Sequence, residues 1–212
     1  MKKIHILAGA LLMLLAINLN AQTVAEVKLI APLEEDRGWC LDLRGSRANA
    51  EPIGGVHGHT CYTYEGEGVA LDQGFFVENI HENNEFRMSG FSDLCMTLYE
   101  ANPGSFVSIE TCDDRDTQGF TLQESGRIVA DMSPDLCLTA GSFVLPGGGG
   151  RPLHIMRDLS FEECGGVASE LQAWELRSEW NGLEEATLPR PFADGAGPPG
   201  AGPGAGQGPQ GG

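Results

Sequence analysis

Short apolar runs that alternate with polar residues recur along the chain from residue 27 onwards. Four of them are Phe75-Phe76-Val77, Met96-Thr97-Leu98, Phe106-Val107-Ser108-Ile109 and Arg127-Ile128-Val129. Glycine, proline, asparagine and aspartate separate these runs. The pattern predicts many short β-strands joined by turns. Helical spacing is scarcely sustained before residue 160, and only 161–171 is expected to hold a helical turn or two.

One unit of this pattern occurs three times. Each copy has a cysteine at the start of a strand, a Gly- or Pro-rich stretch, a second strand and a Gln-x-aromatic tripeptide. The three tripeptides are Gln73-Gly74-Phe75, Gln118-Gly119-Phe120 and Gln172-Ala173-Trp174. In the third, more divergent copy, 153–158 is taken as the second strand, because Asp158 follows Cys137 by the 21 residues that separate Cys61 from Cys40.

The three copies span about residues 28–80, 81–125 and 126–177. Each is too small to bury an apolar face alone, so the three must share a core. A closed, threefold β-barrel satisfies this requirement and also removes exposed strand edges. The sequence therefore predicts an all-β domain of three repeats within residues 22–180.

The six cysteines fit the same repeat. Six cysteines allow fifteen pairings, but the repeat selects one pair in each copy. The expected disulfides are Cys40–Cys61, Cys95–Cys112 and Cys137–Cys164. No two cysteines show the close C-x-x-C spacing typical of zinc sites, so no metal is expected.

Both ends of the chain differ in composition from the repeats. Residues 1–21 combine Lys2 and Lys3 with an apolar run of 12 residues, Ile6 to Ile17. A run of this length predicts a cleaved signal peptide rather than a membrane span, and hence a secreted protein, extracellular or periplasmic. Residues 181–212 are polar and then rich in glycine and proline, which predicts a disordered tail.

The formal net charge is −17, and it becomes −19 without the two lysines of residues 1–21, which hold no acidic residue. A chain this acidic repels the phosphates of nucleic acids and anionic membrane surfaces. The charge thus excludes nucleic acid and membrane insertion as expected partners without indicating a particular one.

The repeated Cys-Leu-Asp or Cys-x-Thr start, the second cysteine and the threefold Gln-x-aromatic resemble the ricin B-type β-trefoil lectins. The resemblance covers about residues 28–177. It implies a β-trefoil in which Phe75, Phe120 and Trp174 fill the shared core. It also implies up to three shallow sugar sites, one in each repeat, and no cofactor.

Only the first repeat keeps the set of polar residues that the resemblance implies for a sugar site. Asp42 stands at the acid position, His57 and His59 at the polar and aromatic positions, and Asp72 with Gln73 near the tripeptide. A carboxylate accepts hydrogen bonds from two neighbouring hydroxyls, and a ring covers the C–H face of a sugar.

In this set His59 replaces the usual Trp or Tyr, and Asp72 replaces the usual Asn. The other repeats have Thr97 and Thr139 at the acid position, and we expect their sites to be weak or lost. Retaining the fold does not guarantee the site.

Other interpretations of these residues remain open. Asp42 can simply bond its own turn, and His57 with His59, on one strand face, can bind a metal together with Asp42 or Asp72. Trp39, Tyr62 and Tyr64 flank the first repeat and can line a groove, although Trp39 fits a core position as well. Gln73, Gln118 and Gln172 fit structural hydrogen bonds to backbone.

No catalytic motif is found: the chain has no G-x-S-x-G, no H-E-x-x-H and no phosphate-binding loop. The sequence favours a secreted, non-catalytic protein that binds a glycan or polysaccharide. The alternative is a trefoil that binds a protein, such as a hydrolase inhibitor or an envelope interaction factor. A separate enzyme or other protein is a further partner consistent with the first hypothesis, and a stand-alone enzyme is the least favoured one.

Overall fold

The computed structural model describes residues 22–45, 47–63, 70–113 and 115–179. The predicted signal peptide, 1–21, and the predicted tail, 181–212, lie outside these residues. The described elements, in chain order, are β1 (Val24–Leu29), β2 (Trp39–Leu43), η1 (Arg47–Asn49), η2 (Pro52–Gly54), β3 (Val56–Thr60), β4 (Gly74–Phe76), α1 (Val77–Asn83), β5 (Leu94–Thr97), β6 (Ser105–Phe106), β7 (Ser108–Thr111), η4 (Asp116–Gln118), β8 (Phe120–Leu122), β9 (Ile128–Ala130), β10 (Ser133–Ala140), β11 (Leu145–Pro146), β12 (Ile155–Arg157), β13 (Leu159–Glu163), η5 (Ser169–Leu171) and β14 (Trp174–Arg177).

Three equivalent hairpins carry the internal repeat. They are β2–β3, β5–β7 and β10–β13, all antiparallel. In each hairpin the first cysteine lies opposite the residue two positions before the second cysteine: Cys40 opposite His59, Cys95 opposite Glu110 and Cys137 opposite Glu162. The common register brings each pair of cysteines to a Cα–Cα distance of 5.0–5.1 Å, and all three predicted disulfides are present.

This register corrects the sequence alignment of the third repeat. The second strand of that repeat is β13, which pairs with β10, and not 153–158. The segment taken for it contains β12, which pairs with β3 of the first repeat through Met156 opposite His59. The glycine run lengthens the third repeat between its two cysteines, whose separation is 27 residues instead of 21. Equal spacing to Asp158 was therefore coincidental.

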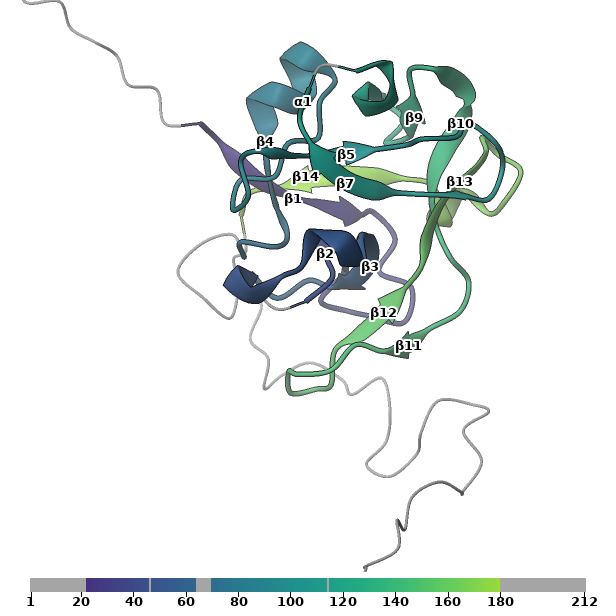
Figure 1. Cartoon of the computed structure of the whole chain (residues 1–212). Coiled ribbons are helices and arrows are strands. Elements are labelled where there is room, and N and C mark those ends of the chain that lie inside the picture. The colour runs from purple at the N-terminus through teal and green to yellow at the C-terminus, as the bar shows by residue number, and fades with distance from the viewer. Residues whose placement is uncertain (1–21, 46, 64–69, 114, 180–212) are drawn as a thin grey trace, which may run out of the picture.

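The first and last strands close the structure on themselves. β1 pairs with β14 along four residues, from Glu26 opposite Arg177 to Leu29 opposite Trp174, and also contacts β2 and β4. In Figure 1 these strands lie side by side below α1, with the first and last repeats sharing one sheet. The closure agrees with the predicted barrel, because the edge of the first strand is covered by the last.

The core is apolar and drawn from all three repeats. Phe75, Phe120 and Trp174 are each only 1% exposed, which confirms their predicted core positions. Phe86 lies between Phe75 and Phe120, with ring centroids 6.3 Å apart on each side, and Phe161 stacks on Phe120 at 5.5 Å. Such ring contacts stabilise the core beyond the area that they bury.

Helical structure differs from the prediction in two places. The seven-residue helix α1 follows directly on β4 and was not predicted. Only Ile80 of this helix is buried, so it lacks the apolar repeat that sequence methods detect. Conversely, 161–171 is mostly not helical, since Phe161 lies in β13 and only Ser169–Leu171 forms a 3-10 turn. No helix of the described residues is long and apolar enough to cross a membrane.

Candidate functional site

The five residues predicted for the sugar site come together at one end of the β2–β3 hairpin. Asp42 on β2 lies directly opposite His57 on β3, and His59 projects from the same face of β3 as His57. The two imidazole rings stack with their centroids 5.3 Å apart. The hairpin register therefore explains why a carboxyl group and two imidazoles meet here.

Gln73 connects this hairpin to the turn after it. Its amide nitrogen donates to Asp42 Oδ2 at 2.6 Å and to the carbonyl oxygen of Thr60 at 3.0 Å. Its amide oxygen accepts a hydrogen bond from the backbone N–H of Tyr62 at 3.1 Å. Gln73 thus uses both ends of its amide, as a structural glutamine would.

The equivalent glutamines make the same three bonds in the other repeats. Gln118 donates to Thr97 Oγ1 and to Thr111 O, both at 3.0 Å, and accepts from Asp113 N–H. Gln172 donates to Thr139 Oγ1 at 2.9 Å and to Glu163 O, and accepts from Gly165 N–H. Asp42, Thr97 and Thr139 are therefore equivalent acceptors, and the first repeat differs from the others by a carboxyl group at this position.

Asp72 lies against a different set of partners. Its Oδ2 accepts a hydrogen bond from the backbone N–H of Arg47 in η1, and its backbone oxygen accepts from Leu43 N–H at 2.9 Å. Its Oδ1 is buried and has no hydrogen-bond partner among the described residues, and the same holds for His57 Nδ1. Two polar atoms of the cluster are therefore left unsatisfied, which costs free energy unless another group binds them.

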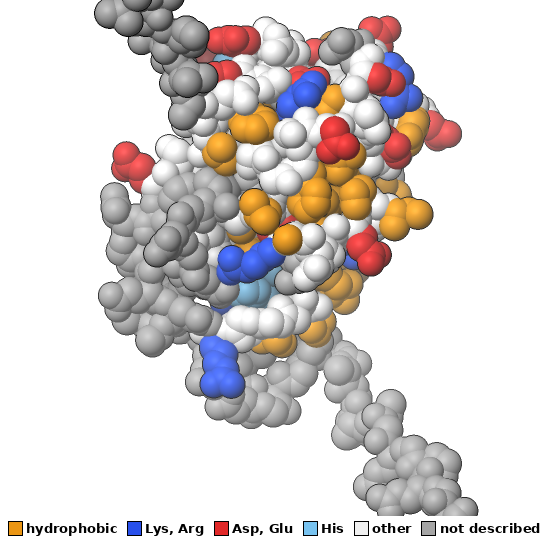
Figure 2. All heavy atoms as spheres, turned by 60° about the vertical axis from the view of Figure 1, so that its left-hand side comes forward, with side chains coloured by type: hydrophobic (Ala, Val, Ile, Leu, Met, Phe, Trp, Pro, Cys, Tyr) orange, Lys and Arg blue, Asp and Glu red, His pale blue; other side chains and the backbone are white. Residues whose placement is uncertain are grey.

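The cluster is nearly closed to solvent. Asp42 is 2% exposed, His57 6%, His59 7% and Tyr62 6%. Figure 2 shows histidine only as a small pale-blue area below a basic side chain and next to uncharged surface. The two imidazoles keep a small exposed area, whereas Asp42 is almost completely buried.

Burial controls the charge of the cluster. It raises the pKa of Asp42 from 3.8 to about 8, although His59 and the hydrogen bond from Gln73 act in the opposite direction. It lowers the pKa of His57 from 6.5 to about 4 and also lowers that of His59. Between about pH 4 and pH 8, Asp42 is protonated and His57 is neutral. Their contact of 3.3 Å is therefore a hydrogen bond between neutral groups.

Two residues outside the predicted set complete the cluster. Tyr62 follows the disulfide of the first repeat, and burial together with the nearby Asp42 and Asp72 carboxyl groups raises the pKa of its hydroxyl. His154, from the third repeat, stacks on Tyr62 with centroids 5.4 Å apart and meets His59 edge-on at 5.2 Å. The sequence had suggested Tyr62 as a groove residue, but no local signal marks His154, because only the β12–β3 pairing brings it here.

Trp39, another suggested groove residue, is a core residue, and Tyr64, the third, lies outside the described residues. It is fully buried, and the Arg157 guanidinium lies 4.7 Å from its ring centroid.

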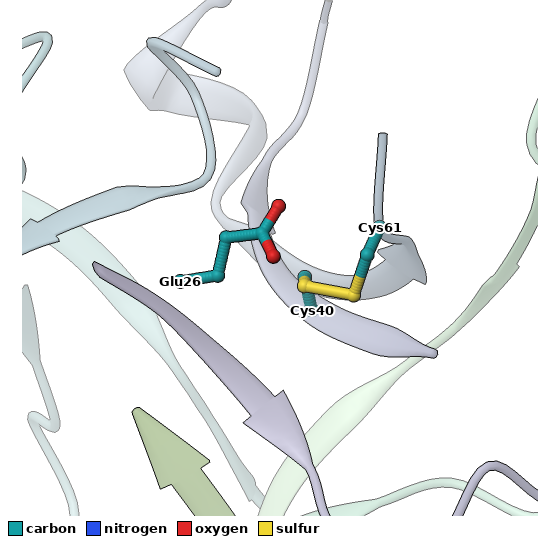
Figure 3. Close-up of side chains that lie close together, drawn as sticks. All are labelled: Glu26, Cys40 and Cys61. Carbon is teal, nitrogen blue, oxygen red and sulfur yellow. A yellow bond between two sulfur atoms is a disulfide. The ribbon is translucent and has the colours of Figure 1, made fainter. Parts of the chain in front are cut away.

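Two groups of potential metal ligands lie outside this cluster, and the chemistry of their sulfur atoms does not suit a metal ion. Among the described residues these groups are Glu26 with Cys40 and Cys61, and Glu85 with Cys95 and Cys112. Figure 3 shows the Glu26 carboxylate beside the first of these disulfides. A disulfide-bonded sulfur is not a thiolate and does not ligate zinc.

The chain was compared with known proteins. No family model matches it. A curated relative, β-galactoside-specific lectin 4 of Viscum album, is 30% identical over 125 residues, which are 59% of this chain and 21% of the relative. The chain thus spans about a fifth of the length of that relative.

Solved structures agree on the fold. The agglutinin of Abrus precatorius superposes with a TM-score of 0.52 at 17% identity, covering 74% of this chain and 49% of that chain. An earthworm lectin C-terminal domain mutant, solved in complex with 6′-sialyllactose, gives a TM-score of 0.50 at 14% identity, covering 74% of this chain and 99% of that chain. The chain is therefore an all-β trefoil, and its predicted resemblance to the ricin B-type β-trefoil lectins is confirmed.

Proposed function

We propose that the protein is a secreted, non-catalytic carbohydrate-binding protein whose main site lies in the first repeat. The site consists of Asp42, His57, His59, Asp72 and Gln73. The single observation that carries the proposal is the contrast at one equivalent position: Asp42 offers a carboxyl group where the other repeats have Thr97 and Thr139.

The chemistry of the cluster suits a polyol. Among the described residues, Asp72 Oδ1 is an acceptor without a partner. His57 Nδ1 is likewise a donor without a partner there when Nε2 accepts a hydrogen bond from protonated Asp42. A sugar hydroxyl both donates and accepts, so two neighbouring hydroxyls satisfy both atoms. The ring edges of His57, His59 and Tyr62 add apolar contact for the C–H face of the sugar.

The similar proteins point to the same class of ligand. The mistletoe relative is named for β-galactoside specificity, and the earthworm lectin was solved with 6′-sialyllactose. Single shallow sites bind sugars weakly, so useful affinity in this protein requires several copies on one surface or a partner chain. A glycan or polysaccharide is therefore the proposed partner.

The exchange Asp42→Thr tests the proposal without disturbing the fold. Threonine at this position keeps the bond from the glutamine amide in the other two repeats, at 2.9–3.0 Å, so Gln73 is expected to keep it too. The full chain is screened on a glycan array and against insoluble polysaccharides. We expect the wild type to bind a sugar class. Asp42→Thr removes the hydrogen bond that Asp42 makes to His57 and is expected to lose about tenfold in affinity, because the imidazole is then no longer held for the sugar hydroxyl.

The matched control is Thr97→Ser, which keeps a hydroxyl at the equivalent position of the second repeat and is expected to bind as the wild type does. Equal binding by wild type and Asp42→Thr would move the site to another repeat. Absence of binding to every glycan, with a native circular dichroism spectrum, would reject the proposal.

That last outcome would favour the alternative, a trefoil that binds a protein partner such as an inhibitor target or an envelope factor. Its structural support is the exposure of large apolar side chains: Ile53 is 96% exposed, Phe143 85% and Phe106 70%. Exposed aromatic and aliphatic side chains of this kind are typical anchors of protein interfaces.

A further inference from the structure

The β11–β12 hairpin belongs to the third repeat but packs beside the first-repeat cluster. β12 pairs with β3 through Met156 opposite His59 and Arg157 opposite Gly58. The hairpin turn is closed by Gly147 N–H donating to His154 O at 2.7 Å and by His154 N–H donating to Gly149 O at 3.1 Å. His154 therefore ends the turn at a fixed place next to His59.

A buried ion pair holds this hairpin to the first repeat. The Arg37 guanidinium is bound by both carboxylate oxygens of Glu35 at 2.7 Å. It also donates to Pro152 O at 2.8 Å and to Leu153 O at 3.1 Å, directly before His154. Because Arg37 is fully buried and Glu35 is 3% exposed, the contact is shielded from water and fixes the position of His154.

The glycine run fits the turn closely around the imidazoles. A Cβ on Gly147 would lie 2.7 Å from His59 Nε2, and a Cβ on Gly150 would lie 2.2 Å from His154 Nε2. Gly150 also has a φ of 68°, which favours glycine. The low-complexity run thus has a steric role, since larger side chains would displace two rings of the cluster.

We propose that the first-repeat site is a composite of two repeats, in which His154 of the third repeat contacts the bound sugar. The proposal rests on the carbohydrate-binding function proposed above. His154 is stacked on Tyr62 with an angle of 10° between the ring planes, and it is 6% exposed, as Tyr62 and His57 are. Because His154 meets His59 edge-on with ring centroids 5.2 Å apart, a sugar that contacts His59 lies within reach of His154.

The first experiment measures binding of lactose and 6′-sialyllactose to the full chain by calorimetry. The variants are His154→Ala, His154→Phe and, as the matched control, His81→Ala on the exposed side of α1. Loss of one ring contact is expected to weaken binding by about three- to tenfold in His154→Ala. His154→Phe keeps the ring and is expected to bind within about twofold of wild type, and His81→Ala to be unchanged.

The second measurement is an NMR titration of the imidazole C–H signals, assigned from single His→Ala variants. We expect the added sugar to shift the signals of His59 and His154 and to leave that of His81 in place. A structural role alone would not move the His154 signal.

If His154→Ala binds sugar as the wild type does while Asp42→Thr shows its expected loss of affinity, the composite site is overturned and the proposed function remains. Loss of binding in both His154 variants with a lowered thermal midpoint and no shift of the His154 signal would also overturn it, because His154 would then only support the fold. If Asp42→Thr binds as the wild type does, or no sugar binds at all, the proposed function itself fails.

Discussion

At the scale of single residues, the main feature is a carboxyl group buried where the other repeats have a hydroxyl. Asp42 is 2% exposed and shares the amide of Gln73 with the Thr60 carbonyl. Burying an ionised carboxylate is costly, so the group retains its proton well above the usual pH. The stability of the protein must then depend on pH through this residue.

The sign of this dependence follows from the two shifted pKa values. Asp42 has a pKa of about 8 in the folded protein and 3.8 in the unfolded chain. Because the folded state then binds more protons, the free energy of unfolding falls as the pH rises from 3.8 to about 8. His57 loses its proton at about pH 4 when folded and at 6.5 when unfolded, so its contribution rises with pH between those values. The two effects oppose each other up to pH 6.5, and the lowered pKa of His59 adds to the rise.

We therefore expect maximal stability near pH 6.5 and a loss of about 2 kcal/mol between pH 6.5 and 8, at roughly 1.4 kcal/mol per pH unit for one proton. Urea unfolding at closely spaced pH values measures this directly. Asp42→Thr should remove the decrease above pH 6.5. A wild-type curve that is flat there would show that Asp42 ionises normally in the folded protein.

At the scale of secondary-structure elements, each hairpin is joined to the following turn by one glutamine. Gln118 links β5, through Thr97, to the end of β7, through Thr111, and to Asp113 beyond the second cysteine. The side chain is 3% exposed, so these bonds have no water to replace them. The same arrangement in three repeats shows that the Gln of the Gln-x-aromatic tripeptide fixes the shape of the repeat, and that the aromatic fills the core.

Gln118→Leu, which keeps the size of the side chain but removes its amide, is expected to lower the free energy of unfolding by about 2–4 kcal/mol. The reason is that Thr111 O and Asp113 N–H lose their bonds to the amide. Denaturant unfolding gives the value. Gln123→Leu, at an exposed position in the next turn, serves as the control and should stay within about 0.5 kcal/mol of wild type. A loss as small in Gln118→Leu as in the control would contradict the structural role of this glutamine.

At the scale of the whole molecule, contacts between distant parts of the chain hold the three repeats together. β1 and β14, the first and last described strands, pair with each other. The guanidinium of Arg177 on β14 donates to the fully buried carboxylate of Glu26 on β1 at 2.6 Å and 2.9 Å. Arg37 ties the first repeat to the third through Pro152 and Leu153. Each repeat also closes its own hairpin with a disulfide, so local and long-range restraints act together.

The disulfides are expected to contribute about equally to stability. In the chain-entropy relation, the stabilisation by a disulfide rises with the logarithm of the number of residues in the loop that it closes. For cysteines separated by 17 and 27 residues the stabilisation is about 3 kcal/mol in each case. The double variants Cys95→Ala/Cys112→Ala and Cys137→Ala/Cys164→Ala are compared by denaturant unfolding. Losses that differ by several kcal/mol would mean that packing around one bridge, rather than chain entropy, determines its contribution.

The fold was largely predictable from the sequence because its signals are local and repeated. Three tripeptides and three cysteine pairs in the same order constrain the strands strongly, and the core positions of Phe75, Phe120 and Trp174 followed from them. The third repeat was misaligned, since its glycine-run hairpin is an insertion that spacing alone does not reveal. The helix α1 was missed because it buries a single apolar residue, Ile80.

The sequence by itself determined that the chain is an all-β trefoil with one disulfide in each repeat, and that the first repeat alone has a carboxyl group at the acid position. These properties depend on residue type and order within a repeat. Only the tertiary structure decided that Asp42 is buried and that Gln73 holds it. It also decided that His154, which precedes β12 and lies 95 residues beyond His59 in the sequence, completes the cluster. The burial and neighbours of a side chain arise when strands from different repeats pair, and no pattern within one repeat records that pairing.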